Sequence, residues 1–297
     1  MGAREEVQFR TLDNLTLRGH LYPAGDKSAA IIMTPGFNTT RDVFLPNIAQ
    51  YFQEAGITAL VYDPRTVSSS DGTPRNNINP ALQVGDYHDA LIFLKSDPRV
   101  DPSRIAYWGF SFSGAVALCA AALDKRARAV IAVAPLTIWE LPEGKWQRVM
   151  KKAMQDRESQ LAGNEAFRLP MVTERGDNPA GFGGTGVGKQ ELRLISAAKE
   201  TLPGFDATTT LQTYYNIMAW NPFDLVRFIA PTPMLLVTPE NDAISPAEKQ
   251  RSLYYDRVTG PKQIHIVPNR GHMDALDGDA FAQSMDVQIE FLRRYLT

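Results

Sequence analysis

The hydrophobic positions of this chain fall into short continuous runs that are separated by segments of mixed polarity. A short continuous apolar run is typical of a strand that is covered on both faces of a sheet. Such runs predict strands at residues 29–33, 57–62, 105–110 and 129–134. Earlier in the chain, residues 7–12 and 15–22 flank the turn pair Asp13-Asn14, so we expect them to form an antiparallel hairpin.

Segments with helical character lie between these strands. Phe44, Ile48 and Phe52 recur at helical spacing, and Gly56 follows at the position where a helix would end. We predict helices at residues 43–55, 81–95 and 115–122, with a polar loop at 66–80. The alternation returns near the C-terminus, with strands at 233–238 and 263–268 and helices at 246–258 and 281–296. This pattern predicts an α/β fold with a mostly parallel sheet and helices on both faces.

The alternation fails between residues 136 and 227, where the chain has helical tendency, several aromatic residues and a glycine-rich piece at 181–188. Because the sheet pattern continues afterwards, we interpret this segment as a cap and not as a second independent domain. Ligands of open α/β sheets bind beyond the carboxyl ends of the strands, so a cap there would roof the site. The predicted organisation is a core of residues 1–135 and 228–297 with a cap at 136–227.

Composition narrows the function classes. The chain has 31 Lys and Arg against 33 Asp and Glu, a net charge of -2, and no extended basic stripe, so we expect no nucleic-acid partner. It has no apolar signal core near Met1 and no apolar run of about 18 residues, so we expect a cytoplasmic protein without a membrane partner. The single cysteine, Cys119, excludes an intramolecular disulfide and is expected to pack as a small hydrophobe. Nothing in the sequence sets an oligomeric state.

The candidate nucleophile is Ser111. The predicted strand at 105–110 stops at Gly109-Phe110, and small residues follow at Ser113 and Gly114. A strand, a sharp turn and a helix with serine at the apex form the nucleophile elbow, which needs small flanking residues because the turn is strained. The usual Gly-x-Ser-x-Gly pattern has Ser113 in its last position here. An ordinary strand-to-helix turn is the alternative interpretation of this motif alone.

A serine nucleophile needs a base and a group that orients the base. His272 follows the strand at 263–268 in a loop and can reach over the elbow, whereas His265 lies inside that strand. The orienting acid is expected in the loop after the strand at 233–238, where Asp242 is favoured over Glu240 by its position before the next helix. The order Ser111, Asp242, His272 is the order of α/β-hydrolases and differs from that of trypsin-like and subtilisin-like enzymes.

The oxyanion formed by such chemistry needs backbone N–H donors. One should come from Phe112, directly after the nucleophile, and the other from Phe37, after the strand at 29–33; Asn38 is the alternative. No metal or cofactor is expected, because no Cys/His cluster has metal-ligand spacing. Residues 183–190 nearly match a phosphate-binding P-loop, but Gln190 replaces the Ser/Thr and no strand precedes the glycines, so we interpret them as a cap loop.

Taken with Tyr62-Asp63-Pro64-Arg65, the elbow and the two loops around Asp242 and His272 resemble the α/β-hydrolase superfamily. Within it, the chain is similar to dienelactone-hydrolase-like and X-Pro-peptidase-like proteins, and most of all to the group of polyketide transferases and secondary-metabolite hydrolases. The resemblance covers roughly residues 5–135 and 222–297 but not the cap. The common His-Gly before the oxyanion donor is Pro35-Gly36 here, which leaves a backbone donor in place.

The resemblance implies acyl chemistry on an ester, lactone or thioester of a bulky, polyketide-like small molecule through an acyl-enzyme. Four aromatic residues of the cap are candidates for the substrate pocket, with packing inside the cap as their alternative role: Trp139, Tyr214, Tyr215 and Trp220. Two other functions stay open from the sequence. A peptidase of the X-Pro type would want an acidic anchor in the cap, and none is identifiable. A non-catalytic binding protein would keep the fold but lose the triad.

Overall fold

The computed structural model of the protein describes residues 4–182, 189–202 and 205–297. Within this part of the chain, eight strands form one sheet in the order β1-β2-β4-β3-β5-β6-β9-β10. The pairs β1–β2 and β2–β4 are antiparallel and the other pairs are parallel. The strands are β1 (Glu5–Arg10), β2 (Thr16–Tyr22), β3 (Ser28–Thr34), β4 (Ile57–Tyr62), β5 (Val100–Phe110), β6 (Ala129–Val133), β9 (Met234–Pro239) and β10 (Lys262–Val267). The predicted α/β architecture is confirmed.

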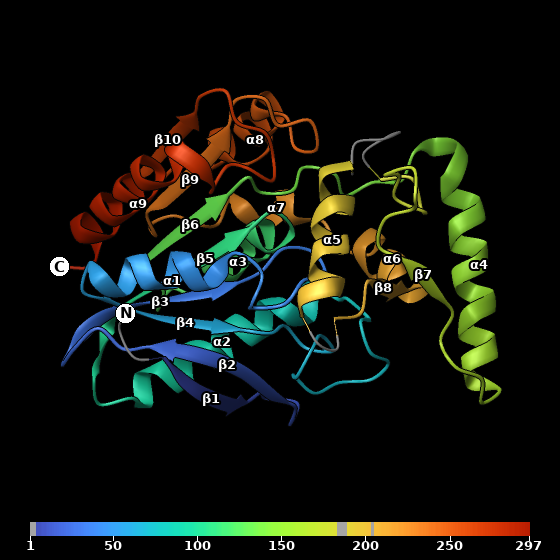
Figure 1. Ribbon diagram of the computed structural model, residues 1–297, viewed down its shortest axis with the longest axis horizontal. Coiled ribbons are helices and arrows are strands. Elements are labelled where there is room, and N and C mark those ends of the chain that lie inside the picture. The colour runs from blue at the N-terminus through green and yellow to red at the C-terminus, as the bar shows by residue number, and fades with distance from the viewer. Residues whose placement is uncertain (1–3, 183–188, 203–204) are drawn as a thin grey trace.

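The central strands are buried throughout because helices cover both faces of the sheet (Figure 1). On one face, Ile48 and Phe52 of α1 and Leu292 of α9 share a core with Ile31 of β3. On the other face, Leu91 of α2 and Val116 of α3 pack with Ile32. The helices of the core are α1 (Leu45–Glu54), α2 (Pro80–Ser96), α3 (Phe112–Leu123), α7 (Pro222–Val226), α8 (Ala247–Leu253) and α9 (Phe281–Tyr295), with short 3-10 turns η1 (Tyr255–Arg257) and η2 (Gly278–Ala280).

The helix predicted at 246–258 is shorter than expected, since α8 ends at Leu253 and η1 follows. Tyr254 separates the two with φ −118° and ψ −62°. Its side chain is fully buried, packs on Phe223 and donates a hydrogen bond to the carbonyl of Leu136. The prediction of one continuous helix is therefore wrong at its last turn, where the φ of Tyr254 departs from the helical value of about −63°.

The segment predicted as a cap lies beyond the carboxyl ends of the parallel strands, on the right in Figure 1. Its helices α4 and α6 pack together around Val149, Ala153 and Tyr214. We expected no strands here, but Arg168 to Pro170 pair antiparallel with Thr208 to Thr210. Strands of three residues are too short to carry a detectable alternation. The elements of the segment are α4 (Glu143–Leu161), β7 (Arg168–Pro170), α5 (Lys189–Thr201), β8 (Thr208–Thr210) and α6 (Leu211–Met218).

In the described part of the chain, no helix is both long enough and apolar enough to cross a membrane.

Candidate active site

Ser111 stands at the sharp turn between β5 and α3. Its φ of 56° and ψ of −117° lie in a region that residues other than glycine rarely adopt, so the turn is strained. The backbone N–H of Ser111 donates to the carbonyl of Val133 at 2.9 Å, which holds the turn against β6. A Cβ at Gly109 would lie 2.0 Å from the carbonyl oxygen of Ser113, so only glycine fits there. The strand, turn and helix expected around the nucleophile are all present.

Ser113 fills the last position of the elbow motif, where glycine is usual. Its side chain is buried, and its hydroxyl lies 2.9 Å from the carbonyl oxygen of Thr34 and 2.5 Å from that of Pro35. The departure from the usual motif therefore ties the elbow to the loop that follows β3. The sequence shows the departure from the motif but not this contact. Thr34 and Pro35 precede Ser113 by 79 and 78 positions, so no local pattern indicates it.

His272 lies directly beside the serine. Its Nε2 is 2.7 Å from Ser111 Oγ and its Nδ1 is 2.7 Å from Asp242 Oδ2. Since an ionised carboxylate only accepts, Nδ1 carries the ring proton and Nε2 accepts the serine hydroxyl. The imidazole is 3% exposed, and its ring centroid lies 5.4 Å from that of Phe110. Packing as well as the two hydrogen bonds therefore holds the ring in place.

Asp242 is 4% exposed and accepts hydrogen bonds on both oxygens. Oδ1 accepts from the backbone N–H of Ile244 at 2.9 Å and of Ser245 at 2.7 Å. Oδ2 accepts from His272 and from Gln250 Nε2, which is 3.2 Å away. These four contacts hold the carboxylate in place and orient it toward the imidazole.

Two neighbouring acids bond to the loop that carries His272 and not to the imidazole. Glu240 is exposed and accepts from the backbone N–H of Asn269 at 2.8 Å. Asp274 accepts from the backbone N–H of Gly271 at 2.7 Å. Both contacts fix the loop that follows β10, and Asp242 is the carboxylate that reaches the ring.

The remaining histidines lie elsewhere. His20 is in β2 beside Glu6, and His88 is in α2 with Nε2 3.2 Å from the carbonyl oxygen of Ala120. His265 is in β10, as expected, and burial lowers its pKa.

The predicted oxyanion donors flank the serine. Phe112 is the first residue of α3, where backbone N–H groups have no partner inside the helix. Phe37 lies in the loop after β3, and its ring meets that of Phe112 edge-on with centroids 5.5 Å apart. The alternative donor, Asn38, uses its side-chain Nδ2 to bond the carbonyl of Thr208 in β8 at 2.8 Å. Phe37, Ser111, Phe112 and His272 all line one cavity.

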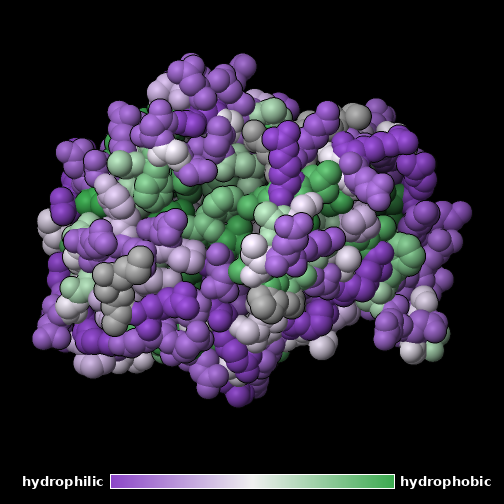
Figure 2. Space-filling view, in the orientation of Figure 1, coloured by the Kyte–Doolittle hydropathy of each residue, from purple (hydrophilic) through white to green (hydrophobic). Residues whose placement is uncertain are grey.

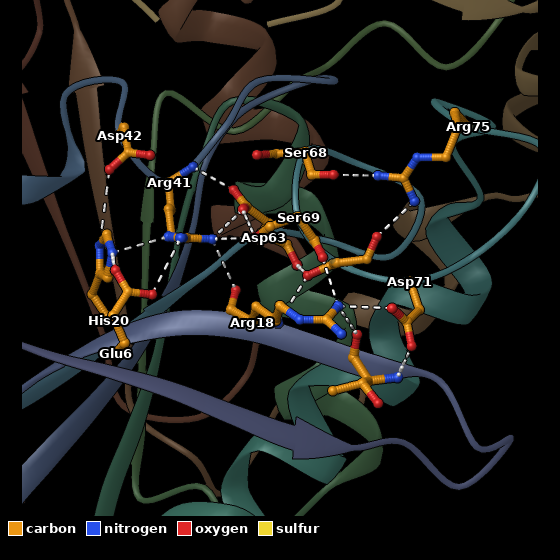
Figure 3. A network of polar contacts seen from close by, with 12 residues as sticks. Glu6, Arg18, His20, Arg41, Asp42, Asp63, Ser68, Ser69, Asp71 and Arg75 are labelled. Atoms are coloured by element: carbon orange, nitrogen blue, oxygen red, sulfur yellow. Dashed lines mark hydrogen bonds and ion pairs between the residues drawn. The ribbon is translucent and has the colours of Figure 1, made fainter. Parts of the chain in front are cut away.

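A buried ion pair anchors the loop that carries Phe37 (Figure 3). The Arg41 guanidinium pairs with Asp63, which is fully buried at the end of β4, and the Arg41 backbone N–H donates to the same carboxylate at 2.8 Å. Ser69 adds a third donor at 3.0 Å. Burial raises the pKa of Asp63, and Arg41 opposes that shift. The loop is therefore tied to the residue that follows β4.

The cavity lies between the core and residues 136–227, the segment predicted as a cap. Core residues such as Val43, Ile48 and Phe110 form one wall, and Met171, Ile195 and Ile217 form part of the other. Figure 2 shows apolar surface gathered in the middle of this face, between α1 and α5. The described lining residues include no aspartate, glutamate, lysine or arginine, so the walls suit an uncharged apolar group.

The structure places the four candidate pocket aromatics differently. Tyr214 lines the cavity, whereas Trp139, Tyr215 and Trp220 are not among its lining residues. Trp139 and Trp220 meet edge-on with centroids 4.8 Å apart, and the Trp139 indole N–H donates to the Leu136 carbonyl at 2.7 Å. Tyr215 packs on the small core under α4 and α6. An aromatic residue in the sequence can line a pocket or pack behind its wall. The sequence alone does not distinguish the two roles, so all four residues were candidates for the pocket.

Two further expectations concern ions and phosphates. In the described part of the chain, no group of three His, Cys, Asp or Glu side chains is arranged to hold a metal ion. The P-loop-like glycines at 183–188 lie outside the described residues.

Comparison with known proteins agrees with this geometry. Residues 31–284 match the Alpha/beta hydrolase family, so the chain belongs to that family. It is 47% identical over 294 residues to a thiohydrolase of Eupenicillium brefeldianum, covering 99% of this chain and 95% of the relative. It is 43% identical to the polyketide transferase ATR5 of Stachybotrys chlorohalonatus, covering 99% of this chain and 98% of the relative. The crystal structure of the alpha/beta hydrolase GrgF from Penicillium sp. is 41% identical, with a TM-score of 0.90 over 99% of both chains.

These findings confirm the resemblance and the class. The chain is an enzyme of the hydrolase or acyltransferase type, built on the α/β-hydrolase fold.

Proposed function

We propose that the protein transfers the acyl group of a polyketide-like thioester to Ser111 and then to water or to a second small molecule. The observation that carries this proposal is the hydrogen-bonded chain from Ser111 through His272 to Asp242, which opens into an apolar cavity. The thioester is suggested by relatives that are named a thiohydrolase and a polyketide transferase.

In the first half-reaction, His272 Nε2 takes the proton of Ser111 as the oxygen attacks the thioester carbonyl. The negative charge that develops on the carbonyl oxygen is stabilised by the N–H groups of Phe37 and Phe112. Asp242 holds the imidazole in the required tautomer and stabilises the imidazolium. Collapse of the tetrahedral intermediate breaks the C–S bond, and the proton leaves with the thiol.

In the second half-reaction, His272 activates the acceptor that attacks the acyl-enzyme. Water gives a free acid, whereas an alcohol or amine gives an ester or amide. The apolar cavity limits how many water molecules reach the acyl-enzyme, which favours a bound acceptor over hydrolysis. We infer that residues 136–227 act as the cap that sets this balance, because α5 and α6 supply cavity walls at Ile195 and Ile217.

The lining argues against the peptidase alternative. A substrate with a charged amino terminus needs a carboxylate partner in a site of low polarity. The described lining residues offer none.

The test is release of thiol from medium-chain and long-chain acyl N-acetylcysteamine thioesters, followed by mass spectrometry of the products with and without added alcohols. We expect thiol release to fall to background in Ser111→Ala, since triad removals typically lower kcat by about 10⁴–10⁶. Thiol release by Ser111→Ala at the wild-type rate would refute the proposal. Labelling of Ser111 by a fluorophosphonate separates an enzyme from a binding protein on the same fold.

A further inference from the structure

The turn that carries the proposed oxyanion donor Phe37 lies directly beside the nucleophile. A Cβ added at Gly36 would lie 3.7 Å from the Cβ of Ser111 and 3.4 Å from a ring carbon of Phe110. Phe37 lines the cavity, and its backbone N–H makes no hydrogen bond with any described residue. Such an N–H can stabilise a developing oxyanion only if its peptide group is already held in a suitable orientation.

Thr39 holds the peptide group to which this N–H belongs. The carbonyl of Gly36 and the N–H of Phe37 are parts of one planar trans peptide, in which the two bonds point in opposite directions. The Thr39 hydroxyl donates to the Gly36 carbonyl at 3.1 Å, and the Thr39 backbone N–H lies 3.4 Å from the same oxygen. With its carbonyl bonded on the Thr39 side, the peptide presents its N–H on the opposite side. A hydrogen bond at the carbonyl also polarises the peptide, which strengthens the N–H as a donor.

Other contacts hold the flanks of this turn but leave that carbonyl to Thr39. The Ser113 hydroxyl lies 2.5 Å from the carbonyl oxygen of Pro35, in the preceding peptide. Asn38 has a φ of 50°, in the left-handed region, and its side-chain Nδ2 donates to a carbonyl of β8 at 2.8 Å. Among the described residues, the carbonyl of Gly36 accepts hydrogen bonds from Thr39 alone. The direction of the Phe37 N–H therefore depends on Thr39.

We propose that Thr39 is a positioning residue of the oxyanion hole: its hydroxyl holds the Gly36–Phe37 peptide so that the Phe37 N–H meets the charge that develops on the substrate carbonyl oxygen. The inference rests on the proposed function and deepens it, since Thr39 acts through Phe37. Loss of the hydroxyl should let this peptide rotate. The barrier to acylation of Ser111 would then rise without a matching loss of affinity for the unreacted substrate.

The experiment compares Thr39→Val, which replaces the hydroxyl by a methyl group of similar size, with Thr39→Ser, which keeps the hydroxyl. The readout is kcat/KM for thiol release from a medium-chain acyl N-acetylcysteamine thioester. We expect Thr39→Val to lower it about tenfold, because misalignment costs less than removal of an oxyanion donor, which lowers rates by about 10²–10³. Thr39→Ser should recover most of this loss.

A second measurement reports on the oxyanion hole itself. A trifluoromethyl ketone with the same acyl chain forms a hemiketal: Ser111 Oγ adds to the carbonyl carbon, His272 takes the serine proton, and the negative charge stays on the former carbonyl oxygen. A thioether with CH2 in place of the carbonyl cannot form this charge. Thr39→Val should raise the inhibition constant of the ketone by the factor by which kcat/KM falls, and should leave that of the thioether unchanged.

Thr201→Val is the matched control, because the Thr201 hydroxyl also donates to a backbone carbonyl, that of Ala197 at 2.8 Å, and Thr201 does not line the cavity. It should match the wild type in both measurements. Equal losses in Thr39→Val and Thr39→Ser, or equal weakening of ketone and thioether, would overturn the inference, since the side chain would then act through its shape. Wild-type behaviour of Thr39→Val would overturn it as well. Absence of thiol release and of ketone inhibition in the wild type would instead refute the proposed function.

Discussion

At the scale of single residues, Gln250 holds the carboxylate of Asp242 in place. Its side chain is fully buried in α8 and donates to the carbonyl of Ser245 at 2.6 Å as well as to Asp242. Its Oε1 accepts from the hydroxyl of Thr238 at 3.0 Å. A glutamine with both ends bonded cannot rotate without leaving buried polar groups unpaired. It therefore fixes the acid that orients His272.

Asp242 and Glu240 make the sharpest comparison at this scale. We expect Asp242→Asn to lower kcat for thiol release by roughly 10⁴, because the amide would favour the wrong imidazole tautomer. Glu240→Gln should be far milder, since Glu240 bonds only a backbone N–H in the histidine loop. Equal losses in the two variants would contradict the assignment of the acid.

The two histidines near the C-terminus give a second test. His272→Ala should abolish labelling of the protein by a fluorophosphonate, because no other base contacts the serine in the described residues. His265→Ala should be labelled at close to the wild-type rate, since His265 lies within β10. Gel fluorescence over time measures both rates, and the reverse pattern would contradict the assignment of His272.

The sequence predicted Ser111, Asp242 and His272 because each follows a recognisable strand, and the structure brings the three together. It did not predict Gln250 or the contacts of Ser113. Both act through hydrogen bonds between elements that are distant in the chain, and neither residue type is unusual where it stands. Such contacts depend on three-dimensional packing and leave no local pattern.

At the scale of elements, the loop between β3 and α1 carries Phe37, a proposed oxyanion donor, and also Arg41, which belongs to a buried ion pair. Arg41 of this loop reaches both Asp63 and the ring of His20, which lies 3.3 Å from the Arg41 Nε. Burial lowers the pKa of His20, and the charge of Arg41 adds to that effect, while Glu6 opposes it. Asp42 lies 3.9 Å from the ring, and the charge of Arg4 also lowers the pKa of His20.

This arrangement predicts a stability that depends on pH. The pKa of His20 is lower in the folded protein than in the unfolded chain, where it is near 6.5. The unfolded state therefore binds more protons as the pH falls below that value, and the free energy of unfolding should decrease. Urea unfolding at pH 8 and about pH 5.5 measures the change. His20→Gln should reduce this decrease, and a decrease of the same size in the variant would contradict the explanation.

Most elements of the core were predictable because parallel strands that are covered on both faces consist mainly of apolar residues. β3 and β4, for example, have no exposed position. The errors arose where tertiary contacts override local pattern. α8 ends before the buried Tyr254, whose side chain contacts Phe223 and Leu136, and β7 and β8 pair over too few residues to be recognised.

At the scale of the whole molecule, the cavity between the core and residues 136–227 is the feature that we propose selects the substrate. Its position was predictable, because the interruption of the strand and helix pattern marks an insertion over the carboxyl ends of the strands. Its lining was not. Trp139 packs against Phe112 and Trp220 and is not part of the cavity wall. Aliphatic residues such as Ile195 form much of that wall.

Leu194 of α5 allows the size of the cavity to be tested, since it lines the cavity while being only half-buried. Leu194→Trp should lower kcat/KM for long acyl chains about tenfold relative to acetyl, because it fills space that the chain needs. Leu161→Trp is the matched control, since Leu161 is 85% exposed at the end of α4. An unchanged ratio in Leu194→Trp, with the melting temperature preserved, would place the acyl chain elsewhere.

The central claim is that the acyl group is carried on Ser111. The most direct measurement is acid quenching of the protein during turnover of an acyl N-acetylcysteamine thioester, followed by intact-mass and peptide mass spectrometry. We expect a mass increase equal to the acyl group less one hydrogen, located on Ser111 and absent from Ser111→Ala. Product formation without an adduct in the wild type, together with turnover by Ser111→Ala, would contradict the account.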